Sequence, residues 1–197
     1  MPSNTLQKIN RPKFLTLAGT TALQPNLNGE MKIEPAIITK KAFKVVGLEL
    51  YTSFKDGRNR AEIPQFFHKV LAEARLENVP NRVNQNQLCL FKFKKGSPDF
   101  LYIMGVEVES NHEIPAGMTS VDIPASQYAR ATIIKRGAED VGRVFEYINQ
   151  EWLPQSAYIP GNSPAFIYYD DRFFSVFYER GYEGQPVADV YFPVKPK

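Results

Sequence analysis

Two stretches of the sequence decide the fold, residues 145–156 (FEYINQEWLPQS) and residues 164–173 (PAFIYYDDRF). The second stretch is short and rich in aromatic residues, which predicts a strand. The first predicts an amphipathic helix that ends near Pro154, because the residue before a proline resists helical geometry. A helix that brings the only tryptophan beside an aromatic strand builds either a core or a ligand site. Its apolar residues recur at helical spacing: Val141, Phe145, Ile148 and Trp152.

The composition is that of an ordinary soluble globular protein of one domain or two small modules. Of the 197 residues, 43% are apolar and 23% are charged. No apolar run approaches the roughly 20 residues of a membrane span, and the N-terminus has no secretory pattern. Cys89 has no partner for an internal disulfide, which is typical of the cytoplasm. His68 and His112 lack metal-ligand spacing, so we expect neither a metal nor a cofactor.

The positive charge of the chain is concentrated near its N-terminus. Residues 1–41 carry six Lys or Arg against two Glu, so the remainder has a net charge of −1 within the total of +3. A nucleic-acid binder places a basic stripe on its folded body, so we expect no direct binding of nucleic acid. Residues 1–35 have little periodicity and predict an extended arm or tail. An arm that exchanges between subunits would instead make a homodimer.

The rest of the chain, residues 36–197, predicts the same order of elements twice. The order is strand, helix, strand, strand, in halves of about residues 36–110 and 118–195, which suggests an internal duplication. We therefore expect an α+β fold with antiparallel sheets, helices on one face and a cleft between the halves. The expected strands are 36–54, 88–94, 100–108, 118–134 (interrupted at Pro124), 165–169, 173–178 and 188–194, and the expected helices are 63–75 and 139–153.

Several segments in this order resemble the GyrI-like small-molecule-binding family, the effector-binding domain of multidrug-sensing bacterial regulators, which is built from a duplicated SHS2 module. The resemblance implies a pocket for hydrophobic, often cationic, compounds between the two halves. Members occur alone or fused to DNA-binding domains, and the short leader here favours the stand-alone form. The matching segments are KAFKVVGLEL from Lys41, IPQFF from Ile63, YIMGVEVE from Tyr102, VDIPASQYA from Val121, EWLPQS from Glu151, YDDRF from Tyr169 and DVYFPVK from Asp189.

The resemblance also implies which residues line the pocket. Many members carry a glutamate in the strand before the YDxRF motif, and the matching residue here is Ile167. A cationic ligand would then depend on Asp189 or Glu107. Ile167 and Tyr169 share one face of their strand, as Asp189 and Tyr191 do of theirs, and we expect all four to line one cavity. The full set of expected ligand-binding residues is Tyr51, Phe67, Glu107, Trp152, Ile167, Tyr169, Asp189 and Tyr191.

Three classes of function remain open at this point. The leading hypothesis is a non-enzymatic binder of a hydrophobic small molecule, acting as a sensor or a sequestering protein. The second is a hydrolase of strained, electrophilic natural products, which would need a carboxylate or a tyrosine that activates water. The third is a protein-interaction module such as a gyrase modulator. No phosphate loop, nucleophile elbow or Cys-His pair occurs in the sequence.

Overall fold

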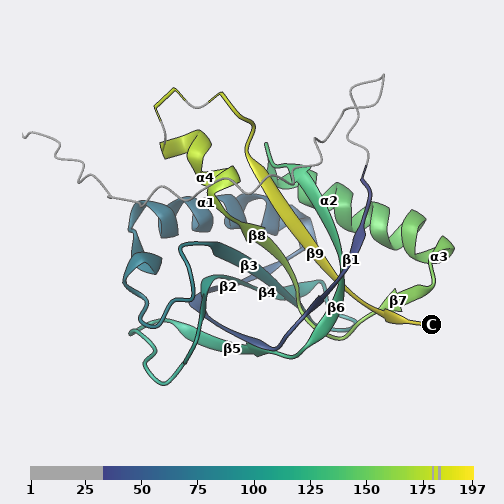
Figure 1. The fold of residues 1–197 in the computed structure, drawn as a ribbon, viewed down its shortest axis with the longest axis horizontal. Coiled ribbons are helices and arrows are strands. Elements are labelled where there is room, and N and C mark those ends of the chain that lie inside the picture. Colours follow the sequence, from purple (N-terminus) through teal and green to yellow (C-terminus); the bar gives the residue numbers. More distant parts are fainter. Residues whose placement is uncertain (1–32, 179, 182) are drawn as a thin grey trace, which may run out of the picture.

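Nine antiparallel strands form one sheet in the part of the chain that the computed structural model describes, residues 33–178, 180–181 and 183–197 (Figure 1). Eight of them follow the order β1-β6-β9-β8-β3-β4-β2-β5, and β7 pairs with β9. The strands are β1 (Ala36–Lys40), β2 (Phe43–Ser53), β3 (Gln87–Phe93), β4 (Asp99–Val108), β5 (Thr119–Ile123), β6 (Ser126–Ile134), β7 (Tyr158–Pro160), β8 (Ala165–Tyr169) and β9 (Val187–Pro196). The helices are α1 (Arg58–Ala72), α2 (Ala138–Tyr147), α3 (Leu153–Gln155) and α4 (Asp171–Tyr178), with short 3-10 turns at Lys55–Gly57 and Arg75–Asn78.

The helices pack against one face of the sheet, called here the helix face (Figure 1). Val70 of α1, Val144 of α2 and Phe173 of α4 belong to one apolar core with strand residues such as Met104 and Val190. The first half, β2-α1-β3-β4, has the predicted order strand, helix, strand, strand. The second half has the same elements β6, α2, β8 and β9, but β7 lies between α2 and β8, and α4 lies between β8 and β9. The predicted α+β class, with antiparallel strands and helices on one face, is therefore confirmed.

The sheet curls strongly about its opposite face, called here the inner face. Only two residues separate β1, at one edge, from β2, which lies next to the other edge. Three Cα steps reach about 11 Å, whereas the six strand spacings between β1 and β2 would cover about 29 Å in a flat sheet. The connection from β5 to β6 is equally short. The two edges must therefore approach each other around the inner face.

The inner face has an apolar core of its own, separate from that of the helix face. Phe43 of β2 and Phe166 of β8 lie three strands apart in the sheet, yet their ring centroids are 5.8 Å apart. This contact shows that the curl closes toward the inner face. The buried members of this core are Phe43, Val45, Leu88, Leu90, Ile103, Ile123, Tyr128, Phe166 and Tyr191.

One predicted strand is wrong, because residues 173–178 belong to helix α4. The carboxylate of Asp170 accepts a hydrogen bond from the backbone N–H of Arg172 at 2.9 Å, and its carbonyl accepts one from the N–H of Phe173. These bonds satisfy N–H groups that a helix start leaves free. Phe173 and Phe174 then pack on the core of the helix face. Aromatic residues favour strands only where the local backbone bonding permits it.

The short strand β7 was not expected, and the other differences concern where elements begin and end. The single strand expected over residues 36–54 is two strands, β1 and β2, at opposite sides of the sheet. Helix α1 begins at Arg58, five residues earlier than expected, directly after Gly57 in the left-handed region (φ 66°). The helix expected to end near Pro154 continues through a π-helical turn at Ile148–Trp152 into α3.

The predicted arm or tail at residues 1–35 falls almost wholly outside the described residues, so the boundary before residue 36 stays a prediction. No helix in the described ranges combines the length and the hydropathy that a membrane crossing requires.

Candidate functional site

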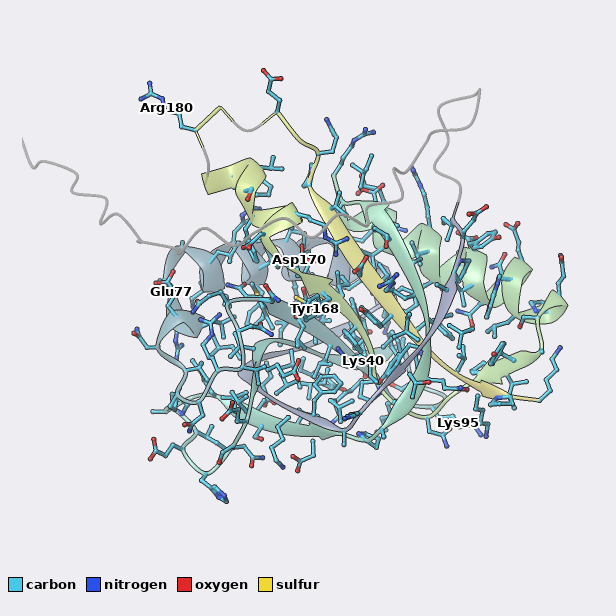
Figure 2. All side chains as sticks on the ribbon, in the orientation of Figure 1. Lys40, Glu77, Lys95, Tyr168, Asp170 and Arg180 are labelled. Atoms are coloured by element: carbon cyan, nitrogen blue, oxygen red, sulfur yellow. The ribbon has the colours of Figure 1, made fainter. Side chains whose placement is uncertain are left out.

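The inner face carries a cluster of aromatic rings around one ammonium group. The Nζ atom of Lys40, the last residue of β1, lies over four rings at 5.0–5.6 Å from their centroids. Figure 2 shows Lys40 and Tyr168 against the middle of the sheet. Distances of this size give favourable cation–π contacts. The four rings, called here the aromatic cluster, are Phe43, Phe166, Tyr168 and Tyr191.

The strand register holds the aromatic cluster together. Phe166 of β8 pairs directly with Tyr191 of β9, and their rings stack with centroids 4.4 Å apart and an interplanar angle of 10°. Tyr128 of β6 packs edge-on against both, at 5.2 Å from Phe166 and 5.9 Å from Tyr191. Phe43 reaches the cluster only because the β1–β2 connection crosses from one edge of the sheet to the other. The cluster thus draws on strands from both halves of the chain.

The tyrosines of the aromatic cluster remain neutral at neutral pH. Burial raises the pKa of Tyr191, and the charge of Asp189 raises it further, while Arg130 opposes the shift. Burial also raises the pKa of Tyr168, and the charges of Glu107 and Asp170 add to the shift. Neutral phenol rings keep the negative π faces that attract cations. The Tyr168 hydroxyl accepts a hydrogen bond from Asn86 at 2.7 Å, which fixes the ring.

A partly buried ion-pair network lies beside the cluster. The carboxylate of Asp189 accepts hydrogen bonds from the Thr132 hydroxyl at 2.6 Å and from Arg172 at 2.8 Å. Arg172 also donates to both carboxylate oxygens of Asp170, and this bonding raises the pKa of Arg172 further. Asp170, Arg172 and Asp189 therefore form a partly buried network. Asp189 is ion-paired with Arg172 and is therefore not an isolated negative group.

The structure brings four of the eight expected site residues to the inner face. Tyr191 is in the aromatic cluster, and Asp189 lies two residues before it on the same strand. Glu107 pairs with Val45, a member of the inner core, and is partly buried. Tyr51 lies toward the other end of β2, 60% exposed, where its hydroxyl donates to Asp99 at 3.1 Å.

The other four expected residues lie on the helix face. Ile167 and Tyr169 share a strand face as expected, but the register pairs Ile167 with Val190 and turns both toward the helices. The expectation that they line one cavity with Asp189 and Tyr191 is therefore wrong. Phe67 of α1 contacts Tyr169 in that core at 5.6 Å. Trp152 stacks on Tyr158 at 5.9 Å and packs against the same core.

The sequence interpretation missed Lys40, Phe43, Phe166 and Tyr168. A usable signal was present in the run AFIYY, because Phe166 and Tyr168 alternate with Ile167 and Tyr169. Side chains of a strand point alternately to its two faces. The choice of Ile167 and Tyr169 therefore placed that part of the expected site on the helix face. Among the described residues, no three Cys, His, Asp or Glu side chains are grouped to hold a metal ion.

Comparison with known proteins identifies the family to which this antiparallel α+β fold belongs. Residues 36–194 match the model of Cass2, the integron-associated effector binding protein. The chain belongs to this family of GyrI-like effector-binding domains.

The similar proteins include bacterial transcription regulators. The chain is 26% identical over 159 residues to the transcriptional regulator BrlR of Pseudomonas aeruginosa PAO1, which covers 80% of this chain and 54% of BrlR. It therefore spans about half the length of that relative. The fold is also that of SAV2435, solved with bound tetraphenylphosphonium (TM-score 0.62, 16% identity, 82% of this chain and 94% of that one). The EcmrR C-terminal domain is similar too (TM-score 0.61, 13% identity, 85% and 100%).

Proposed function

We propose that the aromatic cluster of the inner face binds a hydrophobic small molecule that carries a positive charge. The observation that carries this proposal is the position of the Lys40 ammonium, which lies over four rings at 5.0–5.6 Å. A set of rings that holds one cation by its π faces offers the same attraction to another, at about 0.5–2 kcal/mol for each contact. In this proposal the chain is a sensor or sequestering protein of the cytoplasm.

In this proposal most of the ligand's affinity comes from its contact with the aromatic rings of the inner face. Most of the described inner core is apolar, and small-molecule sites are mostly apolar with a few polar anchors. Glu107 is the candidate anchor, because its charge acts on Tyr168 and it has no ion-pair partner among the described residues. SAV2435, whose fold this chain shares, was solved with a lipophilic cation, which supports the choice of ligand class.

The test uses two probes of the same shape and opposite charge, tetraphenylphosphonium and tetraphenylborate, titrated into the full chain by isothermal calorimetry. We expect saturable binding of the cation and none of the borate. Tyr168→Leu should weaken cation binding about 2- to 30-fold, the equivalent of one cation–π contact of about 0.5–2 kcal/mol. Tyr168 is only partly buried, so this variant should fold.

Phe93→Leu is the matched control, since Phe93 is an aromatic strand residue that is 52% exposed and lies outside the aromatic cluster. It should leave the dissociation constant unchanged. Equal losses in the two variants, or tighter binding of the borate than of the phosphonium, would contradict the proposal. The affinities are compared only if both variants unfold at the same urea concentration as the wild type.

A further inference from the structure

We infer that Lys40 is a tethered internal cation, which occupies the aromatic cluster in the unliganded protein and which a cationic ligand must displace. This inference rests on the proposed function, and it names the residue that regulates access to the same site. The family resemblance assigned no role to Lys40, whose ammonium group contacts the four rings of the aromatic cluster.

The ammonium of Lys40 is held by rings and by no carboxylate in the described part of the chain. Two other lysines illustrate the usual arrangement, in which Lys44 pairs with Asp122 at 2.7 Å and Lys135 donates to the carbonyl of Gly137 at 2.7 Å. For Lys40, the contacts are the four rings of the aromatic cluster. The side chain thus occupies the position that a bound cation would take.

The position of Lys40 in the fold permits its release. It is the last residue of β1, which among the described strands pairs only with β6, and a two-residue connection follows it. Its side chain is partly exposed. Rotation of the side chain outward would break the cation–π contacts without breaking an ion pair. The released ammonium would be hydrated in the solvent, which suits a compact, strongly hydrated charge.

This exchange favours a particular class of ligand. A primary ammonium gains hydration on release, whereas a quaternary ammonium or phosphonium ion, with its charge buried under carbon, loses little hydration on entry. The site should therefore prefer weakly hydrated, permanently charged organic cations to primary amines. An anion paired with Lys40 is the opposite hypothesis, but an anion there would face the negative π surfaces of the surrounding rings.

The first experiment compares Lys40→Met with Lys41→Met, using tetraphenylphosphonium and calorimetry on the full chain. Both variants lose one charge from the same segment, but Lys41 is exposed and lies outside β1 and β2. If Lys40 competes, the ligand binds only the fraction of molecules with an open cluster, and removing the competitor tightens binding. We expect about tenfold tighter binding for Lys40→Met and no change for Lys41→Met.

The second experiment observes Lys40 directly, through the NMR signals of lysines methylated with ¹³C, a modification that keeps the charge. In the free protein one signal, absent in Lys40→Met, should be shifted upfield by the surrounding rings. Tetraphenylphosphonium should return it to the position of a solvated lysine. A Lys40 signal at the solvated position before any ligand is added would overturn the inference.

The outcomes separate this inference from the function on which it rests. Equal affinity of wild type and Lys40→Met, with an unmoved Lys40 signal, would overturn the inference and leave the cation site standing. Binding by Lys40→Met alone would support both. Absence of binding in wild type and variant would overturn both, and tighter binding of tetraphenylborate to wild type than to Lys40→Met would establish the anion hypothesis instead.

Discussion

At the scale of single residues, the two faces of the sheet bury different kinds of polar group: an ion-paired carboxylate on the inner face, and neutral thiol and phenol groups on the helix face. On the inner face, Asp189 accepts hydrogen bonds from Thr132 and Arg172. On the helix face, burial raises the pKa of Cys89 and of Tyr169, and Lys135 opposes the shift of Cys89 only in part. Burying a charge without a partner is costly, so such groups stay neutral. The helix face is therefore a structural core, and the ion pair between Asp189 and Arg172 lies on the inner face.

Cys89 gives a residue-scale prediction about pH. Burial raises its pKa from 9.0 to about 12. Because the folded pKa is the higher one, the thiol's contribution to stability is complete below pH 9 and is lost as the pH rises toward 12. Between pH 8 and pH 10.5 the stability of wild type relative to Cys89→Ala should fall by about 2 kcal/mol.

Urea unfolding of both proteins at the two pH values measures this difference. Burial is the main cause of the raised pKa of Tyr102 and Tyr169, and Cys89 adds to both shifts. The part of their effect that comes from burial is common to both proteins and cancels in the comparison. A constant difference between wild type and Cys89→Ala across this range would mean that the thiol titrates normally in the folded chain.

At the scale of elements, the pairing of β2 with β4 shows how the sheet can curl. Gly47 and Gly105 face each other in the register. A Cβ atom at Gly105 would lie 2.6 Å from the carbonyl oxygen of Val46 and 2.9 Å from a methyl group of Val45. At this one pair of positions the strands leave no room for a side chain, and glycine in a strand often marks such a close approach. Because Gly47 and Gly105 have no side chains, the two strands can bend toward the inner face at this point.

Gly105→Ala should therefore lower the free energy of unfolding by about 1–3 kcal/mol, because the surrounding backbone must move. Gly142 of α2 is the matched control, since a Cβ atom there would meet no atom within 4 Å. Gly142→Ala should raise stability by about 0.5–1 kcal/mol through the helix propensity of alanine. Thermal or urea unfolding measures both changes in stability. A free energy of unfolding that Gly105→Ala leaves unchanged would contradict the explanation by close packing.

Elements also show where prediction from sequence ends. The periodicity around Val141 predicted the second helix, and the alternating runs predicted β3, β4, β8 and β9 almost to the residue. Residues 173–178 were mistaken for a strand, because the bonds from Asp170 that start α4 are not visible in aromatic content. Local pattern therefore specified most elements, and it failed where a single capping side chain decided the outcome.

At the scale of the whole molecule, the site depends on long-range geometry that local pattern does not contain. Lys40 and Phe43 reach Phe166 and Tyr191 only because two short connections cross between the edges of the curled sheet. The family resemblance supplied the fold and the class of ligand site. It did not supply the strand face, so Ile167 and Tyr169 were expected where Phe166 and Tyr168 lie.

The most direct test of the account is to find which face of the sheet contacts a bound cation. The measurement is intermolecular NOEs between tetraphenylphosphonium and the aromatic protons of the isotopically labelled full chain. We predict NOEs to Tyr168 and Tyr191 of the aromatic cluster. NOEs confined to Trp152 and Phe67, on the helix face, would contradict the account and restore the site expected from the sequence.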